Sequence, residues 1–296
     1  MNSLKNLLII TFFWANYLVF SQKVPYLIYN SNAEIITYEK MVNECLNADI
    51  IFFGEIHNNS MCHWLKLQII KDIYQANKNI IIGAEMFEAD NQLILNELID
   101  KQIHFSKFEE DARLWPNYKT DYRPIVEFCY KNNIPIIATN IPRRYASKVA
   151  YSGLQSLDSL TSEAKKYIAP LPIVFDSTLN CYKNMLQMKM SKFASGFNLA
   201  QAQAIKDATM AYFITLNLKN NYIFFHINGA YHSDYFEGIV WYLKKYAKTF
   251  NKKENLKIIT ITTKEFDNIY DKVQIKNLGN IASFIIAIQS DMIKTY

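Results

Sequence analysis

Four residue types are scarce in this chain, which has 7 Gly, 7 Pro, 4 Cys and 5 His among 296 residues. So little glycine and proline, in a chain that is 50% hydrophobic and 15% aromatic, excludes a collagen-like fibre, a flexible linker array and a disordered tail. Internal repeats and low-complexity segments are also lacking, which excludes a solenoid. The formal net charge of +5 is a mild excess that gives nucleic-acid binding no support. Any site built from histidine or cysteine must therefore draw on a short set of positions.

The four cysteines have no short spacing between them, so a zinc site of the Cys-x-x-Cys type is excluded. In an oxidising compartment four cysteines allow three disulfide pairings. A chain of this size does not need such cross-links. We therefore expect buried free thiols, with disulfides as the alternative, at Cys45, Cys62, Cys129 and Cys181.

The N-terminus carries one positive charge at Lys5 and then an apolar run from Leu7 to Phe20. This run is short for a membrane-spanning helix, which needs roughly 20 apolar residues. The segment Val19–Ser21 suits a signal peptidase, and no cysteine lies near it to carry a lipid. We predict that residues 1–21 are a cleaved signal peptide, with an uncleaved membrane anchor as the alternative. The protein would then be exported, as a periplasmic or envelope-associated protein, with residues 22–296 forming one α/β domain.

Short apolar runs of strand length alternate with amphipathic stretches of helix length along the rest of the chain. The runs lack period-two alternation, which is typical of strands covered on both faces, and they are Ile50–Phe53, Ile80–Ile82, Ile134–Ala138, Tyr222–Phe225, Lys257–Thr262 and Ser283–Ile288. Apolar residues at intervals of three and four predict helices at Met61–Ala76, Phe87–Ile99, Asp121–Lys131 and Ser233–Lys248. This order predicts an α/β fold with a mainly parallel central sheet flanked by helices.

The stretch from about residue 144 to 219 interrupts this alternation, because it contains no convincing strand. Its segments Asp176–Met190 and Leu199–Leu218 have helical patterns, and Pro170 and Pro172 mark a break before the first of them. We expect an all-helical insertion between two strands of the same sheet.

Polar residues follow four of the predicted strands directly. Ligands of an open parallel sheet bind in the crevice beyond the carboxyl ends of its strands. We therefore expect one edge of the sheet to present Glu55, His57, Glu85, Asn140, Arg143 and His232.

Two of the five histidines occupy matched positions, since Gly54–His57 and Gly229–His232 both read Gly-x-x-His after an apolar strand. We expect each glycine to let the chain turn sharply off its strand, so that the histidine folds back over the sheet edge. Two imidazoles together with the carboxylates of Glu85 and Glu55 suit a divalent transition metal with an open position. Glu55 would be either a metal ligand or the general base that takes a proton from a metal-bound water.

These residues also have plainer explanations. Each histidine could simply cap the turn at the start of a helix. The carboxylate of Glu85 would be costly to bury alone, so either a metal or a cation such as Arg143 must neutralise it. Asp207 shares a helix face with Gln203 and apolar residues, which suggests that it reaches the polar edge of the site and orients a histidine. The other histidines, His63, His104 and His226, are expected on the surface or in the core.

Six motifs carry a resemblance to a known family. They are Gly54–His57, Gly83–Phe87 with Gln92, Trp115, Tyr122–Ile125, Ala138–Arg143, and Gln201–Ala211 followed by Asn228–Ser233. In this order they are similar to the ChaN-like haem-binding uptake proteins of the Tiki superfamily, which also holds TraB-like proteins and resembles erythromycin esterases. The likeness extends from about residue 50 to 288.

The resemblance implies a protein that binds haem and serves haem uptake or iron acquisition at the cell envelope. It adds Gln92 to Asn140, Arg143 and Asp207 as supporting or substrate-binding residues, and it leaves an outer-membrane uptake system and a homodimer open as partners. Tyrosine ligation of the haem is the family expectation, but no motif chooses among the 20 tyrosines. A Met-rich stretch at Met185, Met188 and Met190 is expected to fill the core, with the lining of a slot for the porphyrin as the alternative.

The Tiki metalloproteases imply the alternative, because they associate paired Gly-x-x-His motifs with a divalent metal and hydrolysis. Two functions are therefore compared below: a haem-binding protein of the envelope, and a metal-dependent hydrolase that holds its ion with His57, His232 and Glu85 and uses Glu55 as base.

Overall fold

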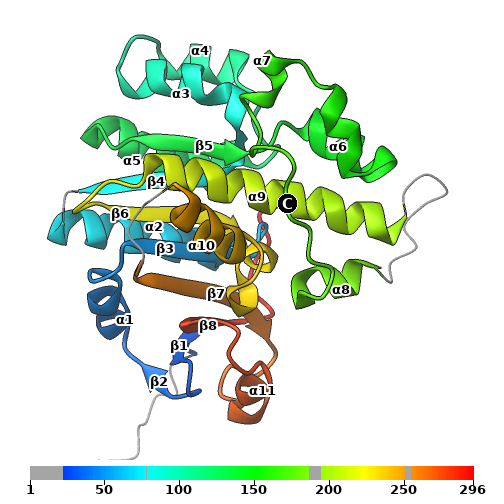
Figure 1. The fold of residues 1–296 in the computed structure, drawn as a ribbon. Coiled ribbons are helices and arrows are strands. Elements are labelled where there is room, and N and C mark those ends of the chain that lie inside the picture. The colour runs from blue at the N-terminus through cyan, green and yellow to red at the C-terminus, as the bar shows by residue number, and fades with distance from the viewer. Residues whose placement is uncertain (1–22, 78, 187–194, 251–254) are drawn as a thin grey trace, which may run out of the picture.

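The computed structural model describes residues 23–77, 79–186, 195–250 and 255–296, and an eight-stranded sheet lies at its centre (Figure 1). The strands are β1 (Tyr26–Asn30), β2 (Ile35–Ile36), β3 (Ile50–Glu55), β4 (Ile80–Glu88), β5 (Ile136–Asn140), β6 (Ile223–Gly229), β7 (Ile258–Phe266) and β8 (Phe284–Gln289). Their order is β2-β1-β8-β7-β3-β6-β4-β5, with β8 to β5 all parallel and β1 antiparallel to both of its neighbours. The predicted α/β fold with a mainly parallel sheet is confirmed, although β1 and β2 were not predicted.

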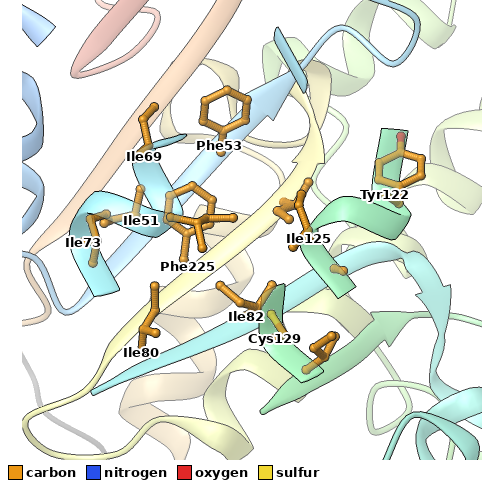
Figure 2. Packing of buried hydrophobic residues seen from close by; sticks show 14 of the residues in the cluster. Ile51, Phe53, Ile69, Ile73, Ile80, Ile82, Tyr122, Ile125, Cys129 and Phe225 are labelled. Atoms are coloured by element: carbon orange, nitrogen blue, oxygen red, sulfur yellow. The ribbon is translucent and has the colours of Figure 1, made fainter. Parts of the chain in front are cut away.

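Both faces of the sheet are covered, which explains why the strands read as unbroken apolar runs. In β3, Ile51 and Phe53 belong to one core and Ile50 and Phe52 to the other, and all four side chains are fully buried. Helices α2 (Ser60–Ala76) and α5 (Arg123–Asn132) pack on the first face, where Figure 2 shows Ile69 and Cys129 directed toward the strand side chains. Helices α9 (Gly196–Asn217) and α10 (Ile239–Thr249) pack on the second. Successive residues of one strand therefore stabilise two separate helical layers.

The remaining helices lie around these layers (Figure 1). They are α1 (Tyr38–Cys45), α3 (Gln92–Ile99), α4 (Phe105–Asp111), α6 (Arg143–Ser152), α7 (Ser162–Lys165), α8 (Asn180–Leu186) and α11 (Lys272–Asn277). Between β5 and β6 the described residues form helices and no strand, and both α6 and α8 pack against α9. Residues 187–190 of the predicted helix Asp176–Met190 lie outside the described residues.

Several predicted helix starts were wrong. The helices expected from Asp176 and Leu199 begin at Asn180 and Gly196. Three other starts differ for local reasons. Strand β4 continues to Glu88, so the helix expected from Phe87 begins only at Gln92. The helix expected from Asp121 begins at Arg123, because Tyr118–Tyr122 forms a π-helical turn. The helix expected from Ser233 begins at Ile239, since Tyr235, Phe236 and Gly238 have φ values of +59°, +57° and +54°, outside the right-handed helical region.

All four cysteines are buried and free, as predicted. In the part of the chain that the structure describes, no helix has the length and apolar character that crossing a membrane requires.

Candidate functional site at the carboxyl edge of the sheet

The two Gly-x-x-His segments lie side by side, because β3 and β6 are adjacent and parallel. Glu55 is paired in register with Gly229, and a Cβ added at Gly229 would lie 2.7 Å from Nε2 of His57. A Cβ added at Gly54 would lie 2.8 Å from Cα of Ala230. The φ of Gly229 is −58°, which any residue adopts, so the expected need for a sharp turn was wrong. Each glycine instead makes room for the other segment.

Glu55 is the anchor of the first segment, and its carboxylate is almost completely buried, with 2% of the residue exposed. The Tyr122 hydroxyl donates a hydrogen bond to it at 2.6 Å, and the buried Lys66 ammonium forms an ion pair with its other oxygen. Burial alone would raise the pKa of Glu55, but the Lys66 charge and the hydrogen bond from His57 outweigh it and hold the pKa at about 2. The Glu55 carboxylate is therefore ionised, its charge is neutralised by Lys66, and it accepts hydrogen bonds from its neighbours.

His57 is oriented by Glu55, whose oxygen lies 3.0 Å from Nδ1. The His57 side chain is 35% exposed, and its ring meets the Trp115 ring edge-on at 5.1 Å. Burial would lower the pKa of His57, but the hydrogen bond to Glu55 and the charge of Glu85 raise it above the ordinary value. His57 does not cap α2, because Asn59 accepts the hydrogen bond from the Cys62 amide at 3.0 Å. The imidazole is thus held as a partly exposed group at the edge of the sheet.

The second segment delivers His232 between two carboxylates. Its Nε2 lies 3.2 Å from Glu85, and its Nδ1 is bonded to Asp207 on α9. Glu85 also accepts the Gly229 amide hydrogen at 2.7 Å, and Asp207 accepts the Tyr182 hydroxyl of α8 at 2.7 Å. Burial would lower the pKa of His232, but the negative charges of Glu85 and Asp207 raise it to about 10. The cation that neutralises Glu85 is therefore the His232 imidazolium rather than Arg143.

Together these groups form a row in which basic and acidic side chains alternate, which we call the charge ladder: Lys66, Glu55, His57, Glu85, His232 and Asp207. Its carboxylates already have cations and hydrogen-bond donors as partners. No group of three or more His, Cys, Asp or Glu side chains among the described residues has an arrangement that could hold a metal ion. The expectation that His57, His232, Glu85 and Glu55 are metal ligands is therefore not supported.

The supporting residues fall in different places. Asn140 ends β5, and its buried Oδ1 has no hydrogen-bond partner within the described residues. Arg143 begins α6 and is exposed. Gln92 lies on α3, where its amide bonds the backbone of the edge strand β5 at Ile136 (2.8 Å) and Ala138 (2.7 Å), so it completes the sheet rather than the charge ladder.

A cavity of about 260 Å³ opens between α6, α8 and α9 beside the charge ladder. It is lined mainly by apolar side chains, including Met185, Leu199 and Ala150, and by the basic residues Arg143 and Lys206. Gln203 belongs both to this cavity and to the ladder, because its amide nitrogen lies 2.9 Å from Nδ1 of His232. Met188 and Met190 of the predicted Met-rich slot lie outside the described residues.

Sequence reasoning missed Lys66, Tyr122, Tyr182 and the part that Gln203 plays. Lys66 falls on the buried face of α2, three residues after His63 and three before Ile69, and a lysine on such a face was a usable signal of an internal anion. His63 joins the same cluster, with Nδ1 2.9 Å from the Lys66 ammonium and Nε2 2.9 Å from the His57 carbonyl. His226 is a fully buried core residue bonded to Thr139, as its strand position predicted.

Comparison with known proteins decides the family. A sequence model described as haem-binding uptake, Tiki superfamily, ChaN, matches residues 41–243, which include both Gly-x-x-His segments, Arg143 and Asp207. The chain belongs to this family. The resemblance expected from the motifs is thereby confirmed.

Individual relatives are distant. ChaN of Campylobacter jejuni, whose structure describes cofacial haem binding, superposes with a TM-score of 0.63 and 19% identity over 90% of this chain and 97% of that chain, which shows the shared fold. An erythromycin esterase in its open conformation aligns with a TM-score of 0.44 and 9% identity over 90% of this chain and 83% of that chain. Protein RETICULATA-RELATED 5, chloroplastic, of Arabidopsis thaliana is 24% identical over 187 residues, which are 58% of this chain and only 25% of that protein.

Proposed function

We propose that this member of the haem-binding uptake family binds haem itself, as an exported protein of the cell envelope that serves haem uptake or iron acquisition. The observation that carries the proposal is the apolar cavity between α6, α8 and α9, next to a charge ladder whose carboxylates are already neutralised. A porphyrin holds its iron through its own nitrogens and needs from the protein an apolar slot and an axial ligand. An edge without free carboxylates suits that ligand better than it suits a bare divalent ion.

A titration of the purified chain, residues 22–296, with haemin tests this proposal. We expect the Soret band to shift and the change to saturate at a fixed ratio of haemin to protein. A titration indistinguishable from that of haemin added to buffer without protein would overturn the proposed haem binding. Analytical ultracentrifugation of the same samples, with and without haemin, tests whether the chain forms the homodimer that the resemblance leaves open.

Export rests on the apolar run Leu7–Phe20 and the peptidase-compatible Val19–Ser21. N-terminal sequencing of the chain recovered from an envelope fraction is expected to start at Gln22. A chain that keeps Met1 and fractionates with cytosolic enzymes would contradict export. Cross-linking in envelope preparations is the corresponding test for an outer-membrane uptake partner.

A metal-dependent hydrolase is the weaker candidate. It requires Glu85 and His232 to turn from each other toward an ion, and Glu55 to leave Lys66. Metal analysis of the haemin-titration sample tests it directly: a stoichiometric divalent metal that is lost in both His57→Ala and His232→Ala would favour the hydrolase over the proposal made here.

A further inference from the structure

The α6–α8–α9 cavity is shaped for the edge of a ligand rather than for a whole one. Pockets that enclose a small molecule measure roughly 300–1,000 Å³. This cavity measures about 260 Å³, and its wall is mostly apolar, with Ala150 from α6, Met185 from α8 and Leu199 from α9. A large flat ligand would therefore insert one side and leave the rest outside.

Two cations line this cavity with no anionic partner among the residues that the structure describes. No carboxylate of the described residues forms an ion pair with Arg143 or Lys206, although both line the cavity. The neighbouring Arg144 differs, because it pairs with Asp90 at 2.7 Å and stacks over the Tyr145 ring. Positive groups beside apolar surface favour a ligand that carries negative charge on an apolar body.

We infer that this cavity takes the carboxylate-bearing edge of a porphyrin, with Arg143 and Lys206 each binding one carboxylate. The inference rests on the proposed haem binding. It adds where the porphyrin edge binds, a place that we call the seat, and it names the two carboxylates as the groups that the protein recognises. Haem carries two propionate carboxylates on one edge of an apolar macrocycle, which matches two cations beside one apolar wall. Ala150, Leu199 and Met185 would contact the macrocycle itself.

Gln203 connects this seat to the charge ladder. It lines the cavity and touches His232, while Met185 lies three residues after Tyr182, whose hydroxyl bonds Asp207. A ligand edge bound between α8 and α9 would thus contact the elements that hold His232 in place. In this arrangement the charge ladder holds the helices that form the seat, and none of its side chains coordinates the haem iron.

The test compares haemin with haemin dimethyl ester on the same set of chains. The variants are Arg143→Gln, Lys206→Gln and their combination, which remove charge from side chains that are exposed or half-buried. Arg144→Gln is the matched control, since it removes the adjacent guanidinium outside the cavity. Ala150→Phe fills the apolar wall without changing charge. Circular dichroism and the thermal midpoint of each variant establish that it is folded.

We expect each charge removal to weaken haemin binding roughly ten- to a hundredfold, the range of a charge-assisted hydrogen bond, and Arg144→Gln to leave it unchanged. The dimethyl ester should bind the unsubstituted chain more weakly and should not respond to loss of Arg143 or Lys206. Ala150→Phe should weaken both ligands.

If the unsubstituted chain binds haemin but Arg143→Gln, Lys206→Gln and Ala150→Phe all bind it equally well, this seat is wrong while haem binding stands. If the unsubstituted chain shows no haemin binding, the proposed function fails and the seat fails with it. Displacement of haemin by an equimolar long-chain fatty acid would overturn the assignment to a porphyrin, because Arg143 and Lys206 would then bind the carboxylate of a lipid.

Discussion

Gly229 stands directly against the imidazole of His57, where a Cβ would approach Nε2 to 2.7 Å and Cε1 to 3.0 Å. The relationship is reciprocal, because the missing Cβ of Gly54 leaves room for Ala230, the residue after Gly229. Each glycine of the paired motif is therefore required by the other copy rather than by its own turn. The two positions differ in what a methyl group would meet, and this difference can be measured.

Gly54→Ala should be the more destabilising of the two substitutions. Its methyl group would meet the backbone Cα of Ala230 at 2.8 Å and the Ile261 carbonyl oxygen at 3.1 Å, so β3 would have to move away from β7 and from the turn that follows β6. Overpacking of this kind costs about 1–3 kcal/mol. Urea denaturation of both variants measures the difference, and an equal loss in Gly229→Ala would show that the backbone contact is not what matters.

Gly229→Ala should instead change the titration of His57. Its methyl group meets a side chain that is 35% exposed and can rotate outward, so the cost to stability is small, but the hydrogen bond to Glu55 is lost. Without that bond the pKa of His57 should fall from its raised value. The NMR titration of the His57 ring proton records this. The resonance of His104, an exposed histidine at the N-cap of α4, serves as the internal reference.

The sequence predicted well which residues lie at the carboxyl ends of the strands, but not which charged groups pair with them. Gly54–His57 and Gly229–His232 could be placed at one edge because parallel strands all end on the same side of a sheet. The sequence also predicted Asp207 at that edge, as an acid on an otherwise apolar helix face, and Asp207 does contact His232. Lys66 could not be assigned to Glu55, because their contact depends on how α2 packs against β3.

The predicted metal site was not supported for the same reason, namely that contacts between distant elements depend on packing that the sequence does not show. The residue types and spacing of Glu85 and His232 are the same whether the two side chains bind a metal ion or form an ion pair with each other, so the sequence cannot distinguish the two arrangements. The charge of Glu85, together with that of Asp207, which the packing of α9 brings to the second ring nitrogen, makes His232 a buried cation. Tyr122 reaches Glu55 from a π-helical turn that no periodicity in the sequence indicates.

Lys66→Met should be strongly destabilising, because it leaves the Glu55 carboxylate buried without its cation. Breaking a buried ion pair by removing one partner costs about 3–5 kcal/mol. The pKa of Glu55, about 2 in the intact protein, should rise at the same time. Lys71→Met on the same helix, at a half-buried lysine with no ion pair among the described residues, is the control. Adding Glu55→Gln to Lys66→Met should recover part of the loss, and strictly additive costs would show that the two charges do not interact.

Stability should be greatest between about pH 4.5 and 6.5. The folded-state pKa of His232, about 10, lies above its ordinary 6.5, so its contribution is complete below pH 6.5 and is lost as pH rises through 10. The folded-state pKa of Glu55, about 2, lies below its ordinary 4.5, so its contribution is complete above pH 4.5 and is lost as pH falls toward 2. One unit of such a shift is worth about 1.4 kcal/mol.

Free energies of unfolding measured from pH 3 to about pH 10 by urea denaturation check this window. In His232→Gln the decline above pH 6.5 should become shallower, because the group that loses its proton is gone. In His104→Gln it should keep its full slope. An unchanged slope in His232→Gln would mean that Glu85 and Asp207 do not hold a proton on this ring.

Removal of divalent metal should leave the fold unaffected. The carboxylates of Glu55 and Glu85 already have Lys66 and His232 as cations, so chelation takes away no counterion on which they depend. The thermal midpoint should therefore be the same with and without EDTA, and added Zn²⁺ or Mn²⁺ at micromolar concentration should not raise it. A site that used the same carboxylates to hold an ion would gain stability from that ion in proportion to its saturation. A midpoint that falls by several degrees in EDTA and returns with one particular metal would therefore show that Glu85 and His232 part to bind it, and would restore the metal-dependent reading of the paired Gly-x-x-His segments.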